Sequence, residues 1–142
     1  MTEARRLVPS LPLFAGGKSF GSRMTSQAQA ESPLPKVQGL IFFGFPLHPA
    51  GKPSDTRAQH LLQIRVPMLF LQGTRDALAD MTLLDAIIKK MGRQASLIKI
   101  DDGDHSFHVP KRSGRTDAQV QAEMLDDLVR WMAISASQMS AA

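Results

Sequence analysis

Four short apolar runs alternate along the chain with segments that have the periodicity of amphipathic helices. Each run is a near-continuous stretch of apolar residues bounded by glycine, proline or polar residues, which is typical of a buried strand. Three of the intervening segments repeat apolar residues three and four positions apart, as one face of a helix requires. The expected strands are residues 11–15, 37–45, 66–72 and 96–100, and the expected helices are residues 19–30, residues 56–64, the segment between Asp80 and Gly92, and the segment from Thr116 onwards.

Local signals indicate where the last two helices begin and end. Asp80 is a good N-cap for the third helix, and Gly92 is expected to end that helix. Thr116 and Gln119 have the spacing of a capping box at the start of the last helix. Residues 135–142 are small and polar, so we expect this tail to fray.

The alternation of strands and helices predicts one α/β domain over residues 1–142, in which residues 1–10 form a short N-terminal segment. Near-continuous apolar strands between amphipathic helices indicate a parallel sheet that is covered by helices on both faces. In such a sheet, functional side chains gather at the carboxyl ends of the strands. Residues that directly follow a predicted strand are therefore the first candidates for a site.

The first predicted strand leads into Gly17-Lys18-Ser19-Phe20-Gly21, which has the G-x-S-x-G spacing of a nucleophile elbow. The serine of such an elbow sits on a strained strand-to-helix turn, and side chains at Gly17 and Gly21 are expected to clash. The backbone N–H of Phe20, at the start of the helix, could hold a developing oxyanion. The residues Gly-Lys-Ser also end a phosphate-binding loop, but that motif needs a glycine at position 12, where this chain has proline.

Two further candidates follow later strands. Asp76 comes after the third predicted strand and His105 after the fourth, so both are expected at the same edge of the sheet as Ser19. The chain order Ser, Asp, His is the order used on the α/β-hydrolase scaffold. In a triad, His105 would take the proton of the Ser19 hydroxyl, and Asp76 would orient the imidazole and stabilise its charged form.

Each of these residues also has a plainer interpretation. Asp76 could cap a turn, and His105 could be an ordinary loop histidine. His108 lies three residues beyond His105, but no third ligand is placed nearby, so we expect no metal site. His48 and His60 have no partner that the sequence identifies, and both are expected to be structural or exposed.

Composition narrows the class of protein further. The chain has 142 residues and no cysteine, which excludes disulfides and thiolate chemistry. The net charge is +4, but the one basic cluster has no interleaved aromatic residues, so we expect no nucleic-acid binding. We find neither a signal peptide nor a run of transmembrane length, and expect a cytoplasmic protein with no membrane association and no cofactor. The basic cluster consists of Lys111, Arg112 and Arg115.

Several blocks of the chain resemble bacterial α/β-hydrolases of the dienelactone-hydrolase-like kind. Among these hydrolases, the chain most resembles the group that shares the hydrolase-like domain of the KAT8 regulatory NSL complex subunit and its testis-expressed relatives. The resemblance extends over residues 11–131 and implies that Ser19, Asp76 and His105 are nucleophile, acid and base of a serine esterase for small esters or lactones. The blocks are PLFAGGKSFGSRM at residues 12–24, GFPLHP at residues 44–49, PMLFLQGTRD at residues 67–76 and DHSF at residues 104–107.

The chain departs from this family at its beginning. The family's sheet has about eight strands and the elbow follows the fifth, so four strands and the loop with the second oxyanion donor would be missing. We therefore expect the C-terminal half of an α/β-hydrolase fold, from a truncated gene or a longer protein. The strand at residues 11–15 would lie at an open edge and favour self-association. Two hypotheses follow: a serine hydrolase that is active at full length, and a non-catalytic interaction module.

Overall fold

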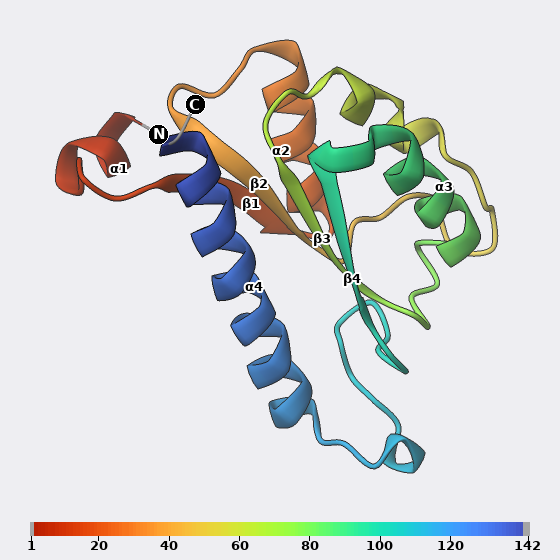
Figure 1. Cartoon of the computed structure of the whole chain (residues 1–142). Coiled ribbons are helices and arrows are strands. Elements are labelled where there is room, and N and C mark those ends of the chain that lie inside the picture. Colours follow the sequence, from red (N-terminus) through yellow and green to blue (C-terminus); the bar gives the residue numbers. More distant parts are fainter. Residues whose placement is uncertain (1, 141–142) are drawn as a thin grey trace.

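The computed structural model describes residues 2–140 and contains a four-stranded parallel sheet (Figure 1). The strands are adjacent in chain order, β1-β2-β3-β4, and every neighbouring pair is parallel. The prediction of a parallel α/β sheet is confirmed. The strands are β1 (Leu13–Lys18), β2 (Val37–Phe43), β3 (Met68–Gly73) and β4 (Ala95–Ile100).

The first strand differs from its prediction at both ends. It begins two residues later and continues through Gly16 and Gly17 to Lys18, which pairs with Phe43 of β2. The two glycines were expected in the turn, but they belong to the strand because the parallel ladder continues to the residue before Ser19. The turn of the elbow is therefore confined to Ser19 itself.

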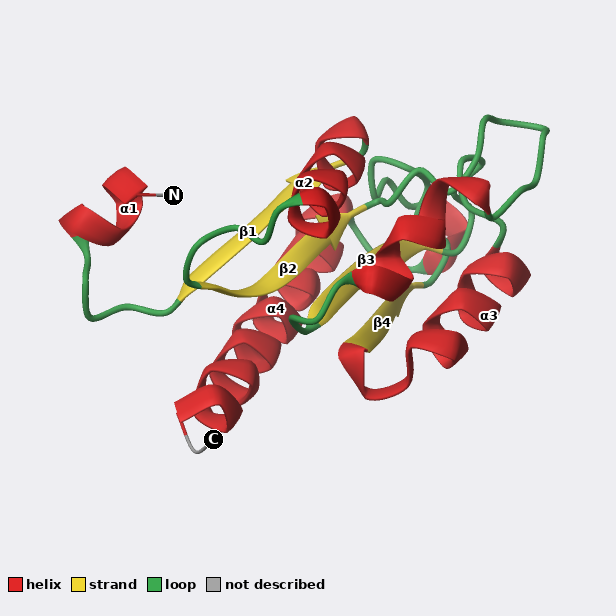
Figure 2. Cartoon of the chain, turned by 90° about the horizontal axis from the view of Figure 1, so that it is seen from above, coloured by secondary structure: helices red, strands yellow, loops and turns green. Residues whose placement is uncertain are grey.

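Helices cover both faces of the sheet, as predicted. The helices α2 and α3 and the 3-10 helix η1 lie on one face, whereas α4 lies on the other (Figure 2). The three connections between consecutive strands all step across the sheet in the same direction. Right-handed crossovers therefore place the helices of these connections on the same face of the sheet. The helices are α1 (Thr2–Leu7), α2 (Phe20–Glu31), η1 (Thr56–Gln63), α3 (Met81–Met91), η2 (Gly92–Gln94), η3 (Lys111–Ser113) and α4 (Asp117–Ser140).

Two apolar clusters fill the spaces on either side of the sheet. The cluster under α2, η1 and α3 is centred on the rings of Phe42, Phe45 and Phe70, whose centroids lie 4.9–5.8 Å apart in tilted or edge-on pairs. The cluster under α4 includes Trp131, which packs against the ring of Phe14 with centroids 5.8 Å apart. These two clusters hold the strand ends, and hence the residues after them, in fixed positions.

Both predicted ends of α3 and the predicted start of α4 are confirmed. The Asp80 carboxylate accepts a hydrogen bond from the Leu83 N–H at 3.0 Å, and Gly92 follows α3 with φ of 59°. Thr116 and Gln119 exchange the two bonds of a capping box.

Residues 135–142 were expected to fray, whereas α4 continues through the described part of this tail to Ser140. Residues 141–142 lie outside the described residues. Ser135 is itself buried. The segment contains no glycine or proline, and its alanine, glutamine and methionine are good helix formers, so nothing in the sequence ends the helix there.

The strand β1 lies at one edge of the sheet and has a neighbour, β2, on one side only. Beyond this edge the short helix α1 lies apart from the rest of the chain in the view of Figure 2. The edge position of the first strand was expected. Self-association through residues 11–15 stays a prediction.

Candidate active site

Ser19 is the single residue between the end of β1 and the first residue of α2. Its backbone has φ of 53° and ψ of −120°, a conformation that costs free energy for any residue other than glycine. The Ser19 N–H donates to the Phe43 carbonyl oxygen at 2.9 Å, which ties the turn to the neighbouring strand. The strained backbone lifts the serine side chain out of both the strand and the helix.

The two glycines of the elbow have different roles. A Cβ atom on Gly17 would lie 2.5 Å from the carbonyl carbon of Gly21, so a side chain at position 17 would collide with the backbone of α2. A Cβ atom on Gly21 would meet nothing within 4 Å. The expected steric requirement is therefore found at Gly17, whereas for Gly21 the expectation is wrong, because its side-chain position faces open space.

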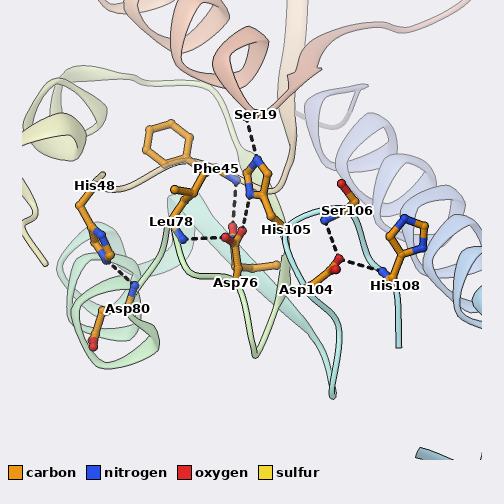
Figure 3. Close-up of polar contacts among 11 residues, drawn as sticks. Ser19, Phe45, His48, Asp76, Leu78, Asp80, Asp104, His105, Ser106 and His108 are labelled. Carbon is orange, nitrogen blue, oxygen red and sulfur yellow. Dashed lines mark hydrogen bonds and ion pairs between the residues drawn. The ribbon is translucent and has the colours of Figure 1, made fainter. Parts of the chain in front are cut away.

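The side chains of Ser19, His105 and Asp76 form a continuous hydrogen-bonded chain (Figure 3). The distance from Ser19 Oγ to His105 Nε2 is 2.8 Å, and the distance from His105 Nδ1 to Asp76 Oδ2 is 2.7 Å. Because a carboxylate can only accept, Nδ1 carries the proton in this contact and Nε2 is left to accept from the serine hydroxyl. The three residues follow β1, β4 and β3, so they meet at the carboxyl edge of the sheet.

The Asp76 carboxylate is buried and accepts three hydrogen bonds. Besides His105, its donors are the Leu78 N–H at 2.8 Å and the side-chain amide of Gln72. Gln72 is itself fully buried, and its carbonyl oxygen accepts from the Phe45 N–H at 2.9 Å. Sequence analysis missed Gln72; its one signal was a polar residue at the end of an otherwise apolar strand.

The loop that carries His105 is held by its neighbour Asp104. The Asp104 carboxylate accepts from the backbone N–H groups of Ser106 at 2.8 Å and His108 at 3.0 Å. Phe107 has φ of 67°, an unusual conformation for a bulky residue, and its side chain is buried. These constraints fix the orientation of the histidine from the chain on both sides of it.

Ser26 and His60 form a second serine–histidine pair. Ser26 Oγ lies 2.7 Å from His60 Nε2, but the serine is fully buried in α2 and its hydroxyl donates to the Arg23 carbonyl oxygen. Burial lowers the pKa of His60, and the positive charge of Arg23 lowers it further. Because the Ser26 hydroxyl already donates to Arg23, the neutral His60 donates its Nε2–H to Ser26 Oγ and ties η1 to α2. The Ser26 hydroxyl is fully buried and has no access to a substrate.

The other two histidines have partners as well. His48 Nε2 accepts from the Asp80 N–H at 2.7 Å, and its other ring nitrogen bonds the Pro49 carbonyl oxygen (Figure 3). His108 is exposed and bonds Asp117 at 2.7 Å, a contact that raises the pKa of His108 above its usual value. His48 and His60 are thus structural residues with partners, which the sequence did not reveal.

The helix α2 begins directly behind Ser19, with Phe20 as its first residue. The first N–H groups of a helix have no acceptor within the helix and carry a partial positive charge. The Phe20 N–H is therefore suitably placed on the chain to bind negative charge that develops next to Ser19 Oγ. Within residues 2–140 we find no group of three or more histidine or acidic side chains that could hold a metal ion.

Comparison with known proteins identifies the family. The α/β-hydrolase domain family matches residues 2–133, and the chain belongs to this family. Among solved structures, an α/β serine hydrolase without a lid from Xanthomonas campestris has a TM-score of 0.61 at 23% identity, with 92% of this chain aligned to 52% of the other. An α/β serine hydrolase homologue from Coxiella burnetii has a TM-score of 0.65 at 18% identity, with 89% aligned to 54%.

A protein from Klebsiella pneumoniae that is named as a dienelactone hydrolase has a TM-score of 0.60 at 16% identity, and 85% of this chain aligns to 51% of it. These likenesses establish the fold. The chain spans about half the length of the solved structures that it matches. No helix within residues 2–140 combines the length and the apolar character that crossing a membrane would require.

The elbow geometry predicts opposite outcomes for its two glycines. Gly17→Ala should displace α2 from β1, because the new methyl group would overlap the Gly21 backbone, whereas Gly21→Ala should be tolerated. We expect Gly17→Ala to lower the free energy of unfolding by about 2–4 kcal/mol and Gly21→Ala to change it by less than about 1 kcal/mol. Urea unfolding monitored by circular dichroism measures both, and equal effects of the two substitutions would contradict the geometry.

The burial of His60 predicts a pH dependence of stability. Because the folded pKa of His60 is lowered, the unfolded chain binds a proton that the folded chain resists. The stabilising effect of the neutral histidine is complete above about pH 6.5, its ordinary pKa, and is lost as the pH falls below that value. The free energy of unfolding should fall more between pH 7.5 and pH 5.5 for the native chain than for His60→Gln.

His108, whose pKa is shifted in the opposite direction, is present in both proteins and cancels from this comparison. Identical pH slopes for the native chain and His60→Gln would mean that His60 titrates in the folded chain as it does in the unfolded one.

Proposed function

We propose that this chain carries the nucleophile, base and acid of a serine hydrolase that acts on small carboxylic esters or lactones. The single observation that supports the proposal most is the chain of contacts from Ser19 Oγ to His105 Nε2 and from His105 Nδ1 to Asp76. The same residues stand in the chain order of α/β-hydrolase triads. Membership of the α/β-hydrolase family and the serine hydrolases among the structural neighbours agree with the proposal.

The geometry supports a two-step acyl transfer. His105 Nε2 takes the hydroxyl proton as Ser19 Oγ attacks the ester carbonyl carbon, and Asp76 stabilises the imidazolium that forms. The Phe20 N–H is the donor that would bind the oxyanion of the tetrahedral intermediate. The imidazolium then returns its proton to the leaving alkoxide, and a water molecule activated by His105 releases the acid from Ser19.

The substrate class rests on the neighbours and on the nucleophile. An esterase from Pyrococcus furiosus, with a TM-score of 0.59 at 14% identity, is another of the structural neighbours, and 89% of this chain aligns to 58% of it. A serine activated by a histidine is suited to carboxylic esters and lactones, whose carbonyl carbon accepts the hydroxyl oxygen.

A second candidate function is an interaction module that keeps the fold without turnover. The observation that favours it is the length of the chain, which spans about half of each structural neighbour. About half of each of those chains has no counterpart in this one. Labelling of the serine distinguishes the two candidates, because an activated hydroxyl reacts with an acylating or phosphonylating reagent even when turnover is slow.

A fluorophosphonate probe should label the full-length protein on Ser19, and Ser19→Ala should abolish the labelling. Ser26→Ala is the matched control, since it removes the hydroxyl of the buried serine–histidine pair and should leave labelling intact. Loss of the nucleophile typically costs a factor of about 10⁴–10⁶ in turnover of such enzymes. The readout is the labelled peptide, identified by mass spectrometry.

Labelling of Ser19→Ala to the same extent as the native protein would overturn the assignment of the nucleophile. An unlabelled native protein that is correctly folded would favour the interaction module.

A further inference from the structure

A cavity of about 240 Å³ lies on the side of the sheet that α4 covers, and its lining includes the residue before Ser19 and the two residues after His105. Its inner wall is apolar and its exposed rim is mostly polar. The inner wall is formed by Phe43, Phe107 and Met124, and the rim by Lys18, Ser106, Gln121 and the apolar Leu125.

The cavity adjoins the proposed catalytic residues through the chain itself. Lys18 directly precedes Ser19, and it pairs with Phe43 in the register of β1 and β2. Ser106 and Phe107 directly follow His105. The cavity therefore lies at the same edge of the sheet as Ser19 and His105, although neither of these two residues lines it.

The inner wall of this cavity depends on a strained residue. Phe107 has φ of 67°, and its N–H donates to the Asp104 carbonyl oxygen at 3.0 Å. Such a conformation costs free energy for a bulky side chain and persists only where the surroundings impose it. Here this conformation accompanies the placement of the aromatic ring in the wall of the cavity.

Lys18 is the cation of the rim. In the part of the chain that the structure describes, no carboxylate lies within 4 Å of its ammonium group. Its charge is close enough to lower the pKa of His108, against the larger effect of Asp117. The acidic groups nearby are already engaged, since Asp104 accepts two backbone N–H groups and Asp117 bonds His108 and the Val109 N–H.

We propose that this cavity binds a negatively charged group of the substrate, so that the site prefers short esters that carry a carboxylate to neutral esters of the same length. The inference rests on the proposed function of Ser19. The apolar wall accommodates a short methylene chain, and the Lys18 ammonium group at the rim binds the carboxylate by a charge-assisted hydrogen bond. The volume limits this part of the substrate to a few carbon atoms.

Two esters with the same leaving group and the same six-carbon acyl chain test the preference in the full-length protein. They are 4-nitrophenyl hydrogen adipate, which ends in a carboxylate, and 4-nitrophenyl hexanoate, which is neutral. We expect kcat/KM for the adipate ester to be about tenfold higher at low ionic strength, and the preference to shrink as salt is added.

Variants of Lys18 identify the group responsible. Lys18→Gln should bring the ratio of the two kcat/KM values close to one, mainly by slowing the adipate ester, whereas Lys18→Arg should keep the preference. Lys89→Gln is the control, because it removes an exposed charge from α3 on the opposite face of the sheet. It should leave the ratio unchanged.

The outcomes separate this inference from the proposed function. Hydrolysis of both esters with a ratio that Lys18→Gln leaves within twofold of the native value would overturn the inference while the hydrolase assignment stands. If neither ester is hydrolysed and Ser19 is not labelled, the proposed function fails. The inference about the cavity is then tested by measuring whether adipate binds to it. Adipate should then shift the backbone amide resonances of Ser106 and Phe107 in the native protein but not in Lys18→Gln, and no shift would overturn it.

Discussion

The buried carboxylate of Asp76 is the group on which the arrangement of the site depends. It accepts from His105, from the Leu78 N–H and from Gln72, and Gln72 in turn binds the Phe45 N–H. Gln72 lies near the end of β3, Leu78 and His105 follow β3 and β4, and Phe45 follows β2. The network around this carboxylate therefore connects the ends of three strands, with β2 joined through Gln72. A buried carboxylate is costly unless it is fully hydrogen-bonded, and the satisfied network offsets that cost while it orients the histidine.

Close contacts between backbone segments position the loop before His105 and the helix behind Ser19. A Cβ atom on Gly73 would lie 2.3 Å from the Gly103 carbonyl oxygen, so the loop before His105 rests directly on the end of β3. Gly17 has the same role between β1 and α2. The strain at Ser19 and Phe107 is maintained by these contacts and by the parallel ladders behind them. The site is therefore a product of the sheet, whose register brings three distant segments of the chain to one edge.

Much of this arrangement is predictable from the sequence. The apolar runs and helical periodicity indicated the parallel sheet and its helices, and the residues after the strands pointed to Ser19, Asp76 and His105. The roles of Gln72, of His60 and of the cavity beside Lys18 were not predictable, because they depend on contacts between residues far apart in the chain, such as Gln72 with Phe45. The open space at the side-chain position of Gly21 was missed for a related reason: the motif gives the spacing of the elbow, but not which glycine faces the neighbouring backbone.

We propose that Asp76 acts on Ser19 only through His105, and a double-mutant cycle on the rate of fluorophosphonate labelling would test this coupling. Asp76→Asn alone should slow labelling of Ser19 in the full-length protein by a factor of about 10³–10⁴, as loss of the correct histidine tautomer does in triads. In a His105→Ala background the same substitution should change the remaining rate by less than about twofold, because the residues of a triad act as a unit. Equal effects of Asp76→Asn with and without the imidazole would contradict the account.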